Sequence, residues 1–335
     1  MSGSEKKQFN IGKWLRGRKG QQFLVMAIFM IVPVLLMLIF TYFPFVEMGR
    51  FSFYKMKYVG KRTFIGWDNY AKVFTRDDCF KALKLSFYYM GGSIIQLALS
   101  LYLATILSFK TKFSGFFKGA MFFPYLINGI AIGFIFKFFY THGFVFDTVL
   151  QWFGFNLDNL PYWLRDQSIN NYSLVGTSVW RYFGQNMVLF IGAIMSVDPD
   201  LYEAATLDGA NKRQLFFGVI LPNIRTIVML NLILSITGSL SAFEPPYVIT
   251  DGANGTGTYF VIMHEIAHTS QKVGLASAMA IVLFLIIVFV TILQKLFFKY
   301  VFPEASDEAK NAARKREAKI QRYIKRKNML KGGAS

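Results

Sequence analysis

The stretch D-P-D-L-Y-E-A-A-T-L-D-G-A-N-K-R-Q-L-F-F-G-V-I-L-P-N, residues 198–223, lies between two long apolar segments. An aspartate beside Pro199 is a helix-start signal, and a short helical segment follows from Leu201 to Leu207. Gly209 permits a turn, and Pro222 fits the first turn of the next helix, where its missing N–H costs little. The pattern predicts a short helix–turn–helix whose small residues would let another chain approach closely.

The segments around this stretch are those of a membrane protein. The chain has 335 residues, of which 54% are hydrophobic, and its mean hydropathy is +0.37. A helix needs about 20 apolar residues to cross a bilayer. We therefore expect an all-α integral membrane fold with six transmembrane helices. The predicted spans are Phe23–Val46, 82–108, 116–140, 172–196, 221–242 and 274–298.

The basic residues predict the orientation of these spans. The formal net charge is +18, and 22 Lys and Arg fall on the side of the two tails, against ten on the opposite side. This bias places both termini in the cytoplasm. The loop 47–81 is an exception, with eight basic residues on the outer side. Because the charges gather at the ends and in loops, bilayer topology and anionic membrane lipid explain them better than nucleic acid does.

Three parts are expected. A cytoplasmic basic tail covers 1–20, a six-helix membrane domain covers 21–298 with the loop of about 198–220 inside it, and a second basic tail covers 299–335. The single cysteine, Cys79, excludes an intramolecular disulfide.

A second motif suggests different chemistry. His264-Glu265-Ile266-Ala267-His268 is an H-E-x-x-H, which on a helix places two zinc-binding imidazoles on one face beside a general base. An intramembrane zinc protease is therefore an alternative. Against it, the motif lies in a predicted outer loop, and the one remaining histidine, His142, is in another loop. We expect a surface helix here and no metal site.

The stretch 198–223 resembles a known family. The pattern E-A-A-x₃-G-x₉-[I/V]-x-L-P is the signature of the permease subunits of binding-protein-dependent ABC importers. The extended form with D-G-A is similar to the carbohydrate, or maltose-type, branch. The matching residues are Glu203, Ala204, Ala205, Asp208, Gly209, Ala210, Phe216, Val219, Leu221 and Pro222. Further resemblances lie at Phe122-Phe123-Pro124, at Trp163-Leu164-Arg165-Asp166 and at Gly274–Ala278.

The resemblance implies a type I importer permease bundle with a cytoplasmic coupling helix, in the membrane of a bacterial cell. It implies a transport subunit rather than an enzyme. The implied partners are a second homologous permease, two cytoplasmic ATPase subunits and an extracytoplasmic solute-binding protein. ATP and Mg²⁺ would be bound by the ATPases, and this chain would hold no cofactor. The coupling residues would be Glu203, Ala204, Ala205, Asp208 and Gly209.

Polar residues inside the spans are candidates for the substrate path, since such groups tend to face a cavity or another helix. Sugars are bound by aromatic faces and by amide or carboxylate groups. Interhelical hydrogen bonding is the alternative role. Arg181 either pairs with Glu244 or meets an acidic sugar. The candidates are Asn128, Trp180, Arg181, Gln185, Asn186 and Glu244.

The nature of the substrate stays open at this level. A sugar or oligosaccharide is expected from the resemblance, and glycerol-3-phosphate, a sugar acid or a polyol are alternatives within the same class. An ion-coupled secondary transporter is an alternative of another class. The sequence contains no Walker A motif, so any ATPase must be a separate subunit.

Overall fold

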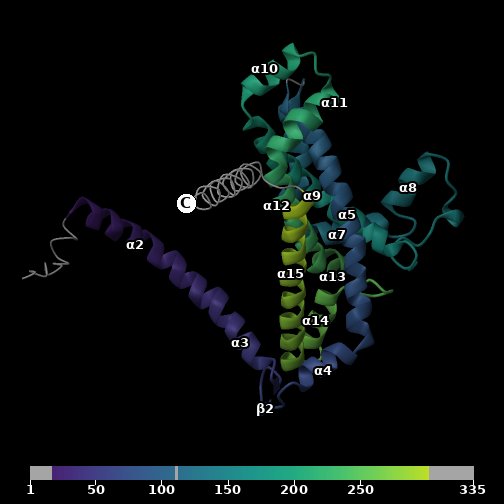
Figure 1. Ribbon diagram of the computed structural model, residues 1–335. Helices are drawn as coiled ribbons and strands as arrows, with labels where there is room; N and C mark the ends of the chain where they lie inside the picture. The colour runs from purple at the N-terminus through teal and green to yellow at the C-terminus, as the bar shows by residue number, and fades with distance from the viewer. Residues whose placement is uncertain (1–16, 110–111, 302–335) are drawn as a thin grey trace, which may run out of the picture. The chain divides into compact units, whose positions relative to one another are not determined.

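The structure is a computed structural model that describes residues 17–109 and 112–301; the tails predicted beyond these residues lie outside it. The chain divides into two compact units. The first comprises Met1–Arg76 and Met263–Val282, and the second comprises Asp77–Ile262 and Leu283–Ser335. Figure 1 shows their helices, which dominate the fold.

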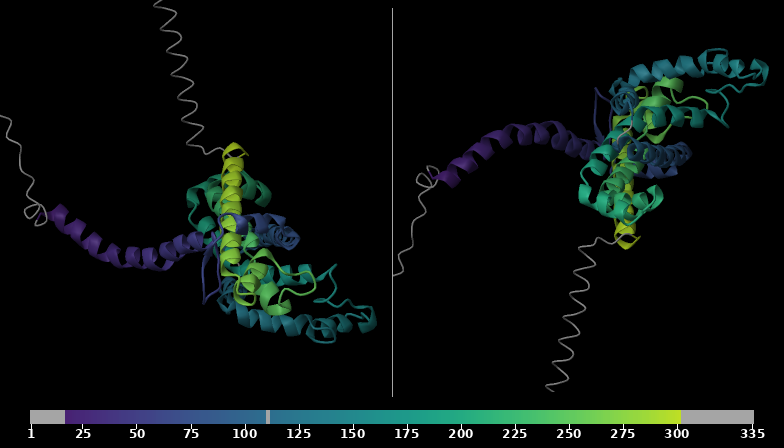
Figure 2. Two further views of the ribbon diagram at one scale, coloured as in Figure 1. Left: turned by 90° about the horizontal axis from the view of Figure 1, so that it is seen from below. Right: turned by 90° about the horizontal axis from the view of Figure 1, so that it is seen from above.

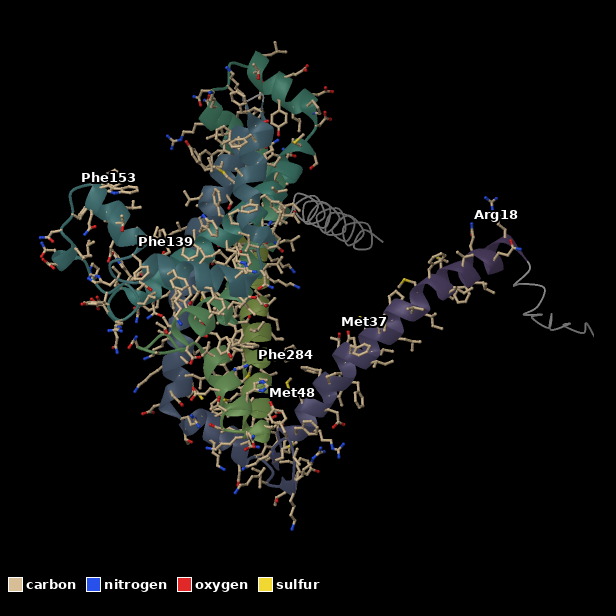
Figure 3. The ribbon with its side chains drawn as sticks, turned by 180° about the vertical axis from the view of Figure 1, so that it is seen from behind. Arg18, Met37, Met48, Phe139, Phe153 and Phe284 are labelled. Atoms are coloured by element: carbon tan, nitrogen blue, oxygen red, sulfur yellow. The ribbon has the colours of Figure 1, made fainter. Side chains whose placement is uncertain are left out.

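The first unit opens on a long apolar helix. It consists of α2 (Arg18–Met37), a π-helical turn at Leu38–Tyr42 and α3 (Phe43–Phe51), which follow one another without a gap. Figure 2 shows that this segment curves gently along its length. Its side chains project on all sides of the helix between Arg18 and Met48 (Figure 3). This continuous apolar surface suits a lipid environment and confirms the first predicted apolar helix.

A small two-stranded hairpin follows the long helix in the same unit. Strands β1 (Tyr54–Lys55) and β2 (Thr63–Phe64) pair antiparallel, and α4 (Asp68–Thr75) comes next. The Asn69 side chain donates to the carbonyls of Ser52 and Tyr54, at 2.8 and 3.0 Å, and so ties α4 to the end of the preceding helix.

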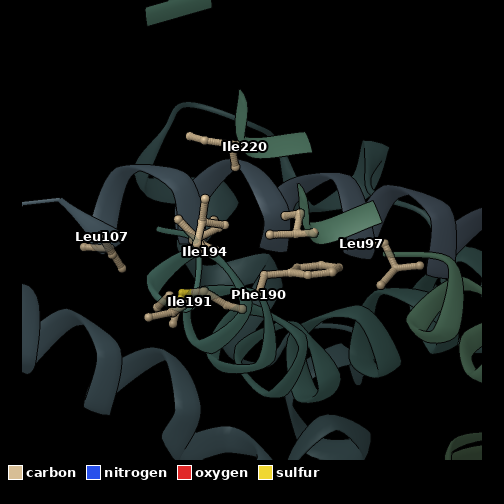
Figure 4. Packing of buried hydrophobic residues seen from close by; sticks show 10 residues of the cluster. Leu97, Leu107, Phe190, Ile191, Ile194 and Ile220 are labelled. Atoms are coloured by element: carbon tan, nitrogen blue, oxygen red, sulfur yellow. The ribbon is translucent and has the colours of Figure 1, made fainter. Parts of the chain in front are cut away.

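The second unit is built on three long helices. α5 (Asp77–Ser108), α9 (Asn170–Met195) and α12 (Leu221–Leu240) pack against one another. They share a cluster of buried apolar side chains, with Phe190 and Ile194 at its centre and Ile220 at its edge (Figure 4). The other elements are α6 (Ser114–Leu126), α7 (Gly129–Tyr140), α8 (Val145–Trp152), the 3₁₀ turn Leu157–Asn159, α10 (Pro199–Leu207), α11 (Lys212–Leu215), the π-helical turn Phe216–Ile220 and α13 (Glu244–Thr250). The boundary between the two units falls within two further helices. It lies after Ile262 in α14 (Tyr259–His268) and after Val282 in α15 (Val273–Val301).

The third predicted span is not one straight helix. α6 and α7 meet at a bend of 97°. α6 ends at Leu126 because Ile127 is extended, and the Asn128 side chain caps α7 by accepting the N–H of Ile130 at 2.9 Å. Pro124 in the last turn of α6 and Gly129 at the start of α7 favour this break.

The number of crossings is not settled by length and composition. Within the described residues, four helices are long and apolar enough to span a membrane, and the bent pair α6–α7 would make a fifth. α9 occupies the fourth predicted span and has 26 residues, but it is richer in polar side chains. Six crossings therefore stay a prediction.

Candidate functional site

A polar cavity opens among the three long helices of the second unit. Its volume is about 430 Å³. α5 contributes Gln96, α9 contributes Asn186 and α12 contributes Asn231, and all three amides are buried. Tyr89 and Tyr182 add aromatic rings. Because buried polar groups in an apolar bundle are costly, their convergence on one cavity marks a place where a polar molecule can bind.

The six predicted substrate-path residues are divided by the structure. Gln185, Asn186 and Glu244 line the cavity. The Asn128 side chain instead caps α7. The Trp180 ring packs edge-on against the Phe136 ring, with 5.2 Å between the ring centroids. Whether any of the six contacts a substrate stays a prediction.

Arg181 and Glu244 form an ion pair at the wall of this cavity. The pair joins α9 to the first residue of α13, and it lies against Gly129 at the start of α7. A Cβ at Gly129 would overlap both charged groups, so the ion pair in this arrangement packs directly against the backbone of Gly129. Of the two roles that the sequence left open for Arg181, the described side chains show the pairing with Glu244.

We predict that Arg181→Met lowers thermal stability, because it leaves the Glu244 carboxylate without its partner. Glu244→Gln should restore part of the loss in the double variant, with a coupling energy of about 1–3 kcal/mol. Thermal unfolding of the purified chain in detergent would measure all four proteins. Strictly additive effects of the two substitutions would show that the pair contributes nothing to the fold.

Two polar groups at this site have no hydrogen-bond partner among the described residues. They are the Tyr89 hydroxyl and Nε of Arg181. Tyr89 is only 5% exposed and faces the cavity. A buried donor without a partner costs about 1–3 kcal/mol, so a bound hydroxyl-bearing ligand would recover that energy.

Sequence reasoning did not select Tyr89 or Gln96 as site residues. Both lie in α5, and Gln96 is a lone amide in a helix of mainly apolar and small residues. That isolation was a usable signal, because an amide inside a span needs a reason. Tyr89 carried no comparable signal, since tyrosine is common in helices near the membrane surface.

The predicted helix–turn–helix of residues 198–223 is confirmed. The Asp198 side chain caps α10 by accepting the N–H of Asp200 at 3.0 Å, and Gly209 has a φ of +76°. The Tyr202 hydroxyl donates to the carbonyl of Ile194 at 3.0 Å, and burial raises the pKa of this tyrosine. α10 is thereby anchored on one side, while Glu203 and Leu207 on it are exposed, Leu207 at 88%.

Pro222 lies in the first turn of α12, as predicted. The preceding helix does not stop before it, because a π-helical turn at Phe216–Ile220 leads directly into α12. The wider turn accommodates the backbone position that has no N–H. The Asn223 amide donates to the carbonyl of Val219 at 2.7 Å, which satisfies one acceptor in that turn.

The H-E-x-x-H segment is helical, as expected, and forms the second half of α14. The rings of His264 and His268 lie 4.4 Å apart, and Nδ1 of His268 is 2.8 Å from the Tyr58 hydroxyl. Glu265 is exposed. Throughout residues 17–109 and 112–301, the structure groups no three His, Cys, Asp or Glu side chains as a metal site would require.

The loop 141–171 has its own polar centre. The buried Asp147 carboxylate accepts the N–H of Gly143 and the Nε1–H of Trp163, both at 2.6 Å. Trp163 begins the W-L-x-D segment, so the resemblance there marks a structural contact. In the same segment, the N–H and hydroxyl of Ser168 donate to Asp166 and hold the pKa of that carboxyl below its usual value.

Known proteins match this chain over most of its length. The model of the family described as "Binding-protein-dependent transport system inner membrane component" matches residues 96–302. The probable ABC transporter permease protein YurN of Bacillus subtilis is 32% identical, over 80% of this chain and 94% of its own length. The multiple sugar-binding transport system permease protein MsmF of Streptococcus mutans is 27% identical, over 79% and 92%.

A solved structure supports the fold. It is that of a bacterial ABC transporter involved in the import of the acidic polysaccharide alginate, with a TM-score of 0.74 and 17% identity over 85% of this chain and 98% of the other. With the bent pair α6–α7, the polar cavity and the exposed helix α10 in place, the family match over residues 96–302 identifies the protein: this chain belongs to the family of inner membrane components of binding-protein-dependent transport systems.

Proposed function

We propose that this chain is the permease subunit of an ATP-driven importer that carries a sugar or an oligosaccharide. Members of its family are transport components and not enzymes. Its relatives include permeases named for multiple sugars, for starch degradation products and for arabinooligosaccharides. The observation that carries the proposal is the cavity of buried amides and tyrosine rings in an apolar bundle.

The chemistry of the cavity suits a neutral polyhydroxyl molecule. Amides both donate and accept, so Gln96, Asn186 and Asn231 can pair with sugar hydroxyl groups in either direction. Tyr89 and Tyr182 offer ring faces against which the apolar side of a sugar can lie. The negative charge of Glu244 is balanced by Arg181, so the wall carries no net charge from this pair.

The partners and orientation in the proposal follow the family. A solute-binding protein delivers the cargo, a second permease completes the path, and two ATPases bind ATP and Mg²⁺ and dock on the loop that contains α10. Both termini lie in the cytoplasm, which places α10 there as well. Support for this docking comes from the exposed acidic and apolar side chains of α10, which the described part of this chain leaves uncovered.

The proposal is tested first by deletion of the gene in its own host. Uptake of at least one labelled saccharide should be lost, while uptake of amino acids and inorganic phosphate stays normal. Complementation with the intact gene should restore the saccharide. A deletion strain that loses only a non-saccharide solute would contradict the proposed cargo.

A cavity variant tests the proposed path. We expect Gln185→Leu to raise the KM for the identified saccharide on the order of tenfold, because removing one hydrogen-bonding amide from the cavity wall costs about 1–3 kcal/mol. Gln151→Leu makes the same change at an exposed position of α8 and should leave uptake unchanged. Equal kinetics for the two variants would remove Gln185 from the path.

A further inference from the structure

A second cavity lies wholly within the first unit, and it is strongly basic. Its volume is about 850 Å³. Three segments line it: the β1–β2 hairpin, α4 with Arg76 after it, and the residues before and at the start of α15. None of the described lining residues is Asp or Glu. Six of them carry positive charge: Lys55, Lys57, Lys61, Lys72, Arg76 and Lys272.

The frame of this cavity is tightly held. The N–H of Ile65 donates to the carbonyl of Phe53 at 3.0 Å, and Asn69 bonds two carbonyls of the same turn. α15 approaches the hairpin so closely that a Cβ at Gly274 would overlap the carbonyl oxygen of Tyr54. The basic side chains are therefore gathered by a packed backbone rather than by a loose loop.

The cavity lies where two apolar helices end. The helix of α2 and α3 ends at Phe51, four residues before Lys55, and α15 begins at Val273, directly after Lys272. Both helices are long and apolar enough to span a membrane. Residues at such ends lie at the level of lipid headgroups, whichever face of the membrane they occupy.

Exposed aromatic side chains belong to the same segment of the chain as these basic residues. Tyr58, Phe64 and Trp67 belong to the hairpin and the turn after it, and each is more than half exposed, Trp67 at 70%. Trp and Tyr at span ends are typical of the membrane–water interface. In this segment the exposed aromatic rings suit contact with lipid acyl chains, and the basic side chains suit contact with phosphate groups.

The positive charge of this segment is unusual for its predicted side of the membrane. The loop 47–81 carries eight basic residues on the side that the positive-inside rule leaves poor in them. A basic cluster in such a place needs a local reason. We propose that this cavity binds the phosphate headgroup of an anionic phospholipid and anchors the first unit to the lipid around it.

A phospholipid fits these observations better than a soluble anion does. Ammonium groups act as point charges for phosphate, and each Lys or Arg near an anionic surface contributes to binding. The position at two span ends places the cavity beside lipid, and the aromatic rings supply the apolar contact that a headgroup brings with its chains. A free phosphate would use the lysines but not the rings.

The test uses the purified full chain in phosphatidylcholine nanodiscs that contain a minority of phosphatidylglycerol or cardiolipin. Native mass spectrometry counts the anionic lipids that stay bound to the chain after it is released from the nanodiscs. We expect the triple variant Lys57→Gln, Lys61→Gln, Lys272→Gln to lose retained anionic lipid on the order of tenfold or more. The matched control, Lys81→Gln, Lys84→Gln, Lys137→Gln, removes the same charge outside the cavity and should retain it.

Two further experiments distinguish loss of charge from other causes. The triple Lys→Arg variant at the same positions keeps the charge and should keep the lipid, which separates loss of charge from misfolding. Equal lipid retention by the Gln triple and its control would overturn the proposal. Displacement of the lipid by inorganic phosphate or by an acidic oligosaccharide would also overturn it, since the site would then belong to a soluble anion. These outcomes are independent of whether the cargo of the importer is a sugar.

Discussion

Reversing the charge of Glu203 is expected to lower ATP-dependent uptake about tenfold or more, while the chain itself folds and inserts normally. Glu203 lies on the exposed side of α10, where neither the hydrogen bonds nor the ion pairs of the described residues involve it. Within residues 17–109 and 112–301, Glu203→Arg therefore removes no side-chain hydrogen bond or ion pair. If this carboxylate pairs with a basic group of an ATPase, reversal replaces attraction by repulsion in a desolvated contact, which costs several kcal/mol.

Asp200 provides the matched control for this prediction. It is an exposed acid on the same helix, but it lies outside the family signature. Asp200→Arg should leave uptake nearly unchanged. Co-purification of ATPase subunits and ATP-dependent uptake in proteoliposomes would be measured for both variants. If both reversals impair uptake equally, general electrostatics rather than docking through Glu203 explains the effect; if neither does, the docking role of Glu203 is wrong.

Gly184→Ala is expected to destabilise the chain by about 3 kcal/mol, because the new methyl group has no space. Gly184 lies in α9 where α6 crosses it, and an added Cβ would overlap the backbone carbonyl of Met121. Backbone atoms cannot move aside as the end of a flexible side chain can. Small residues at such crossings let two helices approach closely in a membrane.

Gly192→Ala makes the same change eight residues later in the same helix. Nothing lies within 4 Å of a Cβ built there. In a helix interior, alanine is normally more favourable than glycine by about 1 kcal/mol, so this variant should be as stable as the native chain or slightly more stable. Thermal unfolding in detergent and the yield of folded protein would compare the two. Similar stabilities would show that α6 and α9 are not in close contact.

Local features of the chain were predictable because they depend on neighbouring residues. Asp198 caps α10 and Gly209 adopts a positive φ, as the pattern D-P…D-G indicated. The apolar runs became helices for the same reason, since backbone groups in lipid must be satisfied within their own segment. The H-E-x-x-H segment became a helix, as predicted.

Other features required contacts between distant segments. Asn128 is a polar residue in an apolar run. The surrounding sequence does not distinguish an amide that faces a cavity from one that caps a helix, and the structure shows the cap. The pair Arg181–Glu244 joins residues 63 positions apart. Gln96 and Tyr89 became part of the cavity because α5 packs on α9, which no periodicity within α5 specifies.

The sequence by itself determined the helical membrane class, the family and the position of the exposed loop between α9 and α12, because hydropathy and a spaced signature are properties of consecutive residues. Only the tertiary structure decided which amides line the cavity of the second unit and which lysines line the cavity of the first. The physical reason is that these arrangements come from side chains of different helices meeting in space, and their contact energies depend on packing between segments rather than on the order of residues within one.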